Sequence, residues 1–270
     1  MFEILIKNRI LKFDSGIVMG ILNLTPDSFS DGGMFVDREK ALNRAKQMVS
    51  EGAKIIDVGG ESTGPGSEDV SEEEELLRIY EVLERISFWR KKEDKDFLIS
   101  VDTYKPFVAR ELIKLGIDII NDVTAFRFKN GEMAEVVARN CLGVVLMYSK
   151  DETARTTRKE IEYDDVVKTI KDFWLDRVDF ALKSGVSKRQ IILDPGMGAF
   201  VSAVPKYSFE ILERLRELKE LGYPILVGTS RKSFLGGKIE EREEKSRETS
   251  FLAIRNGADI VRVHEVSMGK

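Results

Sequence analysis

The sequence has one cysteine and one histidine among its 270 residues, together with only six prolines and two tryptophans. A single cysteine, Cys141, excludes an intramolecular disulfide. Because Cys141 precedes the apolar run LGVVLM, we expect a buried and unreactive thiol rather than a nucleophile. The one histidine, His264, follows an arginine near the end of an apolar run, and it is considered below with its neighbours.

Long apolar runs and an excess of positive charge are also missing. No segment approaches the roughly 18 consecutive apolar residues of a membrane span, and residues 1–14 alternate charged and apolar side chains instead of forming a signal-peptide core. The 43 basic and 47 acidic residues give a formal charge of −4, which argues against a surface that binds polyanions. We therefore expect a cytoplasmic protein that binds neither membranes nor nucleic acid.

The chain does contain a regular alternation of short apolar runs and helix-like segments. Strands are expected at residues 17–23, 54–60, 97–103, 118–125, 143–149, 190–196, 224–230 and 259–265. Helices are expected at residues 37–51, 72–91, 105–115, 131–140, 163–184, 207–221 and 243–256. This order predicts one α/β domain over residues 1–270, a (β/α)8 TIM barrel, with a doubly wound open sheet as the alternative.

Two further features complete the predicted barrel. Residues 2–13 read as a β-hairpin that turns near Asn8, and its expected role is to plug the barrel. Few residues follow the eighth strand, so the eighth helix is expected to be missing or vestigial.

Polar residues gather where the predicted strands end, which is where barrels of this kind place their active sites. The most unusual stretch is MGILNLTPDSFSDGG, an apolar strand that runs through Asn23 into a polar loop. Each polar residue taken alone could cap the following helix, but their coincidence at eight strand ends favours an active site. The other candidates at these positions are Thr63 of the ESTGPG loop, Asp102, Asn121, Met147, Asp194, Ser230, Arg231, Lys232, Arg262 and His264.

Chemically, the candidates fall into two groups. Carboxylates, an amide and an ammonium could hydrogen-bond the edge of a flat heterocycle, and they are Asp102, Asn121, Asp194 and Lys232. Oxygen ligands and cations suited to a diphosphate with Mg²⁺ are Asn23, Thr63, Arg262 and His264. The alternative for Arg262 is a buried ion pair with a barrel carboxylate, and the alternative for His264 is a satisfied core residue.

The motifs MGILNLTPDSFSDGG, SVDT, NDVTA, ILDPGMG, GTSRKSFLG and RVHEV follow one another over nearly the whole chain. In this order they resemble dihydropteroate synthase. That family condenses p-aminobenzoate with 6-hydroxymethyl-7,8-dihydropterin diphosphate and releases diphosphate, a step of folate biosynthesis. The resemblance implies Mg²⁺ as the cofactor and a transferase without a covalent nucleophile.

The resemblance also implies roles for individual residues. The pterin would be held by Asp102, Asn121, Met147, Asp194, Lys232 and Arg262. The diphosphate and p-aminobenzoate would lie near Thr63, Ser230, Arg231, His264 and Phe200. Mg²⁺ would be bound by Asn23, and the catalytic groups would be Asn23, Lys232, Arg262 and His264, which stabilise the departing diphosphate. The loops NLTPDSFSDGG and ESTGPG would be mobile and close over the substrates, so that p-aminobenzoate binds last.

Several positions depart from the family pattern. Gly64 stands where an arginine is common, which removes one anion contact unless Arg231 or Arg127 compensates. Ala199 stands where a phenylalanine packs against substrate, with Phe200 next to it, and this resembles the branch that includes sulfonamide-resistant synthases. The family usually dimerises through its last helices, and the short C-terminus leaves both a homodimer and a monomer open.

Two other classes of function remain as alternatives. A catalytically silent paralogue would bind pterin and diphosphate without turnover, and Gly64 and Ala199 are the residues that favour it. A methyltransferase acting on methyltetrahydrofolate would share the barrel and the pterin site but would need no diphosphate site, so Lys232, Arg262 and His264 argue against it.

Overall fold

Eight parallel strands form the centre of the molecule. The computed structural model describes residues 1–14, 16–25 and 33–269. The strands are β3 (Ile17–Asn23), β4 (Ile55–Gly59), β5 (Leu98–Asp102), β6 (Ile119–Asp122), β7 (Gly143–Met147), β8 (Ile191–Asp194), β9 (Leu226–Val227) and β10 (Ile260–Val263). Consecutive strands from β3 to β8 pair side by side, and β10 pairs with both β9 and β3. A bridge between Leu193 and Ile225 joins the remaining edges, so the predicted barrel is confirmed and the open sheet is excluded.

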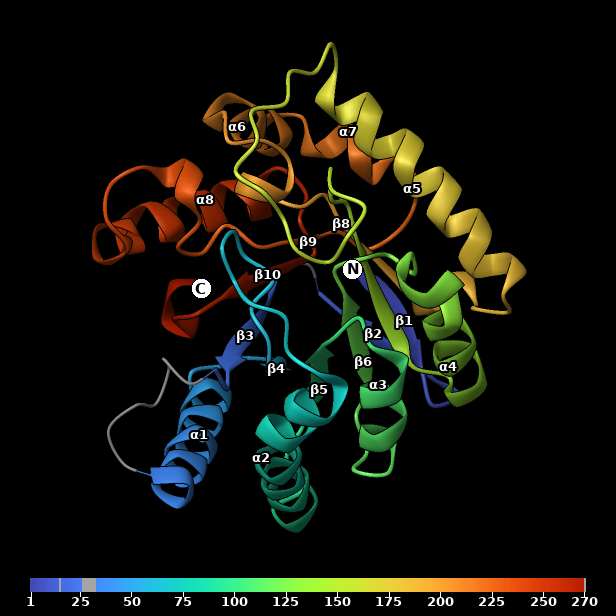
Figure 1. The fold of residues 1–270 in the computed structure, drawn as a ribbon, viewed down its shortest axis with the longest axis vertical. Helices are drawn as coiled ribbons and strands as arrows, with labels where there is room; N and C mark the ends of the chain where they lie inside the picture. The colour runs from blue at the N-terminus through green and yellow to red at the C-terminus, as the bar shows by residue number, and fades with distance from the viewer. Residues whose placement is uncertain (15, 26–32, 270) are drawn as a thin grey trace.

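Helices surround the barrel on its outside, as Figure 1 shows. They are α1 (Gly33–Ser50), α2 (Glu72–Lys92), α3 (Pro106–Ile113), α4 (Glu132–Asn140), α5 (Val166–Lys183), α6 (Pro205–Glu213), α7 (Leu215–Lys219) and α8 (Glu243–Arg255). In the described residues β10 is followed by a short 3₁₀ helix, Val266–Gly269, in place of an eighth α-helix. The helix α8 lies between β9 and β10, and α6 and α7 together occupy the position of one barrel helix between β8 and β9.

The N-terminal hairpin closes one end of the barrel. Strands β1 (Phe2–Ile6) and β2 (Arg9–Phe13) pair antiparallel, and the turn lies at Lys7 and Asn8, whose φ angles are 50° and 61°. Asparagine tolerates this left-handed conformation better than most residues. The plug consists of Phe2, Ile4 and Ile6, which pack against Met19, Ile55, Ile119, Val145, Ile192, Leu226 and Ile260 from successive strands.

The alternation of side chains along each strand places the polar residues inside the barrel. Because residues i and i+2 face the same side of a strand, the position two residues beyond each plug contact also points inward. On four strands this position carries a polar or charged residue, namely Asp57, Asn121, Asp194 and Arg262. The apolar plug therefore lies at the N-terminal end, and the polar groups lie toward the C-terminal ends of the strands.

Most strands are shorter than predicted, β9 most of all, and the helix predicted at 37–51 begins at Gly33. Two of the differences have a clear cause in a side chain that binds the backbone or its neighbours. Strand β6 ends at Asp122, not at residue 125, because the Asp122 carboxylate accepts hydrogen bonds from the backbone N–H groups of Thr124 (2.8 Å) and Phe126 (2.9 Å). The helix predicted at 207–221 is divided into α6 and α7 at Arg214, whose φ and ψ are −98° and 16°. The Arg214 guanidinium is held by carboxylates on both sides of the break, Glu210 and Glu217.

Candidate active site

A cavity of about 310 Å³ lies at the C-terminal ends of the strands. Every side chain predicted from the sequence to form the site lines this cavity: Asn23, Thr63, Asp102, Asn121, Met147, Asp194, Phe200, Ser230, Arg231, Lys232, Arg262 and His264. Residues of the described structure that line it and were not named as site residues are Ile21, Thr25, Glu61, Ser62, Gly64, Val123, Met197 and Gly228. The strands thus bring together residues that are more than 200 positions apart in the chain, such as Asn23 and Arg262.

Arg262 is the electrostatic centre of the cavity. Its Nε donates to Asp57 Oδ2 at 2.7 Å, and its Nη2 donates to Asp102 Oδ2 at 2.6 Å. The Arg262 side chain keeps 17% of its surface exposed and Asp102 keeps 24%, while Asp57 is fully buried. The alternative that Arg262 forms a buried ion pair is therefore confirmed, and the same guanidinium still lines the cavity.

Asp57 is the structural residue that the sequence reasoning missed. Besides Arg262, its Oδ2 accepts a hydrogen bond from Asn121 Nδ2 at 3.0 Å. One carboxylate therefore orients two cavity residues from strands β10 and β6. The signal in the sequence was an aspartate inside the apolar run KIIDVGG, a position where an unpaired charge would be costly.

Burial shifts the acid–base behaviour of the cavity residues. Burial raises the pKa of Asp102 to about 7, with Arg262 opposing and Asp57 adding to the shift. Burial also raises the pKa of Asp194 to about 6, against a backbone hydrogen bond from Gly196 (2.8 Å). The same desolvation, with help from Arg262, lowers the pKa of Lys232 to about 8. These groups therefore change charge close to neutral pH.

His264 is a neutral imidazole at neutral pH. Burial lowers its pKa to about 3, and the nearby cations Arg231, Arg262 and Lys232 contribute in the same direction. Its Nδ1 lies 2.9 Å from Ser230 Oγ, and this hydroxyl also accepts the backbone N–H of His264 at 3.3 Å. When the hydroxyl proton points to Nδ1, the ring proton is on Nε2, so His264 can donate one hydrogen bond without carrying charge.

The positions that depart from the family pattern lie differently around the cavity. Gly64 lines it, but Ala199 does not, and the aromatic wall is formed by Phe200. Lys232 Nζ lies 4.7 Å from the centre of the Phe200 ring, a cation–π contact. Arg127 donates to the carbonyls of Thr124 and Ser149 and is not part of the lining. Of the two arginines expected to compensate for Gly64, only Arg231 therefore lines the cavity.

The described residues of the cavity would fit a magnesium ion that is bound mainly through a diphosphate. Among the described residues, no three histidine, cysteine, aspartate or glutamate side chains come together as a metal site would require. Asn23, at the end of β3, offers one amide oxygen to the cavity. Because Mg²⁺ keeps several water molecules and binds phosphate oxygens, one protein ligand beside a diphosphate is a sufficient set. The predicted loop NLTPDSFSDGG lies mostly outside the described residues.

The same described part of the chain contains no helix that is both long enough and apolar enough to cross a membrane.

Comparison with known proteins agrees with this geometry. The family model for pterin binding enzymes matches residues 19–264. A curated dihydropteroate synthase of Clostridium beijerinckii is 43% identical over 254 residues, which covers 92% of this chain and 88% of that protein. The chain belongs to the dihydropteroate synthase family. The family model and the curated relative therefore confirm the resemblance predicted from the sequence motifs.

Solved structures of dihydropteroate synthases share the fold. One from Xanthomonas albilineans with 4-aminobenzoic acid is 37% identical, with a TM-score of 0.87 and coverage of 99% of this chain and 94% of that one. One from Clostridium difficile in the presence of pteroic acid is 43% identical, with a TM-score of 0.83 and coverage of 96% and 95%. The barrel of this family member therefore corresponds to these enzymes over nearly its full length.

Proposed function

We propose that this dihydropteroate synthase family member condenses p-aminobenzoate with 6-hydroxymethyl-7,8-dihydropterin diphosphate to give 7,8-dihydropteroate and diphosphate. The observation that carries the proposal is one cavity in which buried carboxylates and an amide lie next to Arg262, Lys232 and a neutral imidazole. Relatives named dihydropteroate synthase support it, as do solved structures with 4-aminobenzoic acid and with pteroic acid.

In this proposal the pterin ring lies at the inner end of the cavity. Asp102, Asn121 and Asp194 present acceptors and a donor that match the N–H and C=O groups at the edge of a pterin. Asn121 is oriented by Asp57, and Asp194 by the Gly196 amide, so the polar pattern exists before the substrate arrives. Met147 lines the same region as an apolar, adaptable side chain.

The diphosphate would lie beside the cationic and hydroxyl groups of the cavity. Arg262 and Lys232 supply positive charge, and His264, Ser230 and Arg231 supply further donors. Asn23 would hold Mg²⁺ against the diphosphate oxygens, and the ion would supply charge stabilisation for the leaving group. Thr63 and Phe200 would then border the position of p-aminobenzoate.

The reaction needs no protein nucleophile. The bond between the methylene carbon of the pterin and the diphosphate oxygen breaks, and the electron pair leaves with the diphosphate. The lone pair of the aryl amine forms the new C–N bond, and the amine gives up one proton. Positive charge at Arg262 and at protonated Lys232 stabilises the negative charge that develops on the leaving diphosphate.

A diphosphate-release assay tests the proposal. We expect release that requires both p-aminobenzoate and the pterin diphosphate, formation of 7,8-dihydropteroate by mass spectrometry, and loss of activity in excess EDTA. Tight binding of both substrates without release would identify a silent paralogue, and methyl transfer from methyltetrahydrofolate would identify a methyltransferase. Either result would contradict the proposal.

The proposal includes a single domain for the chain and a location in the cytoplasm, in keeping with the one unpaired cysteine, Cys141. Light scattering of the purified protein distinguishes the homodimer from the monomer.

A further inference from the structure

The connection between β4 and α2, residues 61–71, supplies part of the cavity wall without belonging to the barrel. Ser62, Thr63 and Gly64 of this loop line the cavity. Its own turn is closed at Gly64, whose carbonyl accepts the backbone N–H of Ser67 (3.2 Å) and the Ser67 hydroxyl (2.7 Å). The position of this turn over the cavity therefore depends on what holds the rest of the loop.

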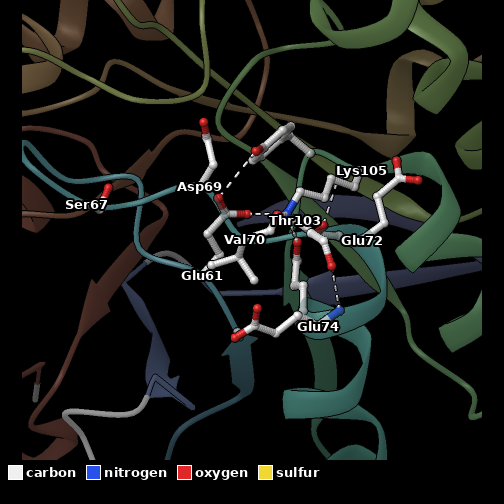
Figure 2. Close-up of polar contacts among 12 residues, drawn as sticks. Glu61, Ser67, Asp69, Val70, Glu72, Glu74, Thr103 and Lys105 are labelled. Atoms are coloured by element: carbon white, nitrogen blue, oxygen red, sulfur yellow. Dashed lines mark hydrogen bonds and ion pairs between the residues drawn. The ribbon is translucent and has the colours of Figure 1, made fainter.

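Lys105 fastens both ends of the loop. Its Nζ lies 2.5 Å from Glu61 Oε2, at the first residue of the loop, and donates to the carbonyl of Val70 at 2.6 Å, near the last. Figure 2 shows Lys105 pointing toward Glu61 and Val70. The same Nζ lies 2.7 Å from Glu75 Oε2 in the first turns of α2. Lys105, Glu61 and Glu75 are each less than 5% exposed, so these contacts are not screened by water.

Arg155 binds the middle of the loop. It lies in the connection between β7 and α5, and its Nε donates to the carbonyl of Ser67 at 3.1 Å. Its Nη2 donates to the carbonyl of Glu68 and to the Glu61 carboxylate, and its Nη1 pairs with Asp69. The guanidinium therefore binds four residues of one loop, a geometry that its planar set of donors allows and an ammonium cannot reproduce.

The segment that carries Arg155 is itself fixed. The next residue, Thr156, donates its backbone N–H to the carbonyl of Thr63 at 3.1 Å. Lys150 Nζ donates to Thr156 Oγ1 (3.0 Å) and to the carbonyl of Ala199 (2.7 Å), the residue before the cavity residue Phe200. The loop is thus connected to the rim of the barrel through residues that do not line the cavity in the described structure.

The charges of this cluster are balanced. Burial acts to raise the pKa of Glu61, but Lys105 and Arg155 outweigh it and lower the pKa. Burial raises the pKa of Glu75, with Lys105 opposing. Two buried carboxylates thus face two cations, and loss of either cation leaves negative charge buried without a full partner.

We propose that Lys105 and Arg155 are positioning residues that hold loop 61–71 so that Thr63 and Gly64 form the aryl-amine wall of the cavity. The inference rests on the proposed function, and it adds to the expected closure of the ESTGPG loop a set of contacts that bind the loop at its ends and its middle. Lys105 and Arg155 act through the loop, and the affinity for p-aminobenzoate depends on them although they contact neither substrate.

The test uses the full-length protein and the variants Arg155→Met, Arg155→Lys and Arg139→Met. Arg155 is 20% exposed, so its loss should leave the barrel folded. Arg139 makes an exposed ion pair with Glu135 on α4 and serves as the matched control for loss of an arginine. The measurements are amide hydrogen exchange over residues 61–71, steady-state kinetics, and calorimetric binding of 6-hydroxymethylpterin and of p-aminobenzoate in the presence of pterin, diphosphate and Mg²⁺.

In Arg155→Met we expect hydrogen exchange in residues 61–71 to accelerate and the KM for p-aminobenzoate to rise about tenfold. The value of kcat and the affinity for 6-hydroxymethylpterin should change by less than about threefold, because the pterin residues lie on the strands. Arg155→Lys should fall between wild type and Arg155→Met, and Arg139→Met should match wild type.

Unchanged exchange over residues 61–71 in Arg155→Met would overturn the inference, and so would faster exchange with an unchanged affinity for p-aminobenzoate. A wild-type protein that binds p-aminobenzoate but releases no diphosphate would contradict the proposed function only. In that case the exchange rates and the calorimetric affinity for p-aminobenzoate still show whether Arg155 positions loop 61–71 for binding.

Discussion

Arg262 Nε and Asp57 Oδ2 lie 2.7 Å apart, between strands β10 and β4. Because Asp57 is fully buried, this ion pair replaces the water that would otherwise solvate both charges, and it fixes the guanidinium at one position in the cavity. The same carboxylate holds Asn121. Asp57 therefore sets the orientation of a cation and an amide that we propose to bind the two halves of one substrate.

Replacing Asp57 by asparagine keeps the volume but removes the charge that both partners share. Arg262 would retain its ion pair with Asp102 but lose the one with Asp57, so we expect the free energy of unfolding to fall by about 1.5–3 kcal/mol. Affinity for the pterin diphosphate should fall about tenfold or more, since both oriented groups lose their anchor. Chemical denaturation and calorimetry measure the two effects.

Asp118 provides the control for this variant. It is a buried carboxylate that pairs with Arg90 and Lys7, and it precedes β6, at the opposite end of the barrel. Asp118→Asn should therefore lower stability by a similar amount and leave pterin affinity unchanged. If Asp57→Asn lowers stability without weakening the pterin complex, Asp57 has a structural role alone.

The raised pKa of Asp102 predicts a pH dependence of pterin binding. Burial raises this pKa to about 7, so the carboxylate is ionised above that pH and protonated below it. If the ionised group accepts a pterin N–H, affinity should fall up to about tenfold for each unit as the pH falls below 7. Calorimetry from pH 5 to pH 9 measures this dependence.

The variant Asp102→Asn distinguishes the contribution of Asp102 to the pH dependence of binding from that of Asp194, whose pKa is raised by burial to about 6. The variant places a donor where an acceptor was, which should weaken pterin binding about tenfold or more. Its remaining pH dependence should move down toward the pKa of Asp194. An unchanged affinity and an unchanged pH profile in Asp102→Asn would remove Asp102 from the pterin site.

The sequence was sufficient for the fold and for the residues at the strand ends, for a physical reason. Apolar runs separated by amphipathic segments specify the strand order, and a barrel brings every strand end to one rim. The sequence alone therefore predicts that Asn23, Asp102 and Arg262 line one cavity. The hairpin plug was predictable too, because Asn8 marks a turn between two apolar runs.

What the sequence could not supply were pairings between distant side chains. Asp57 was passed over inside an apolar run because nothing local indicates its partner Arg262, 205 residues away. The contacts of Lys105 and Arg155 with loop 61–71 likewise join segments that only the closed barrel brings together. The short β6 and the break at Arg214 depend on hydrogen bonds that a pattern of apolar residues does not show.

His264 should act as a neutral hydrogen-bond donor. Burial lowers its pKa to about 3, which excludes a charged imidazole at neutral pH. The pH profile of kcat/KM near pH 6.5 should therefore be the same in wild type and in His264→Gln. That variant should raise the KM for the pterin diphosphate about tenfold and leave binding of 6-hydroxymethylpterin nearly unchanged.

Ser230→Ala tests the same relationship from the other side of the 2.9 Å contact. Without the hydroxyl, the imidazole loses the partner that fixes its tautomer, so KM should move in the same direction as in His264→Gln but by less. A pH profile with a limb near 6.5 that His264→Gln abolishes would show that the imidazole titrates in the working enzyme.

Position 64 is a place where a substitution can add to the cavity the arginine that is common in the family. A Cβ built on Gly64 would lie 3.5 Å from Ser62 Oγ, an ordinary contact, and its φ is not in the left-handed region. Gly196 differs, because its φ is +64° and a Cβ there would lie 2.4 Å from the carbonyl oxygen of Tyr148. An arginine is therefore sterically acceptable at position 64, and the loop that carries it is held by Lys105 and Arg155.

We expect Gly64→Arg to lower the KM for p-aminobenzoate by about tenfold, because a charge-assisted hydrogen bond to the benzoate carboxylate is worth about 1.5–3 kcal/mol. Gly64→Gln has a similar reach without charge, and it should change KM by less than about twofold. Steady-state kinetics at low and high ionic strength separates the two, since only the arginine effect should weaken with salt. Equal constants for wild type and both variants would mean that the benzoate carboxylate lies beyond the reach of position 64.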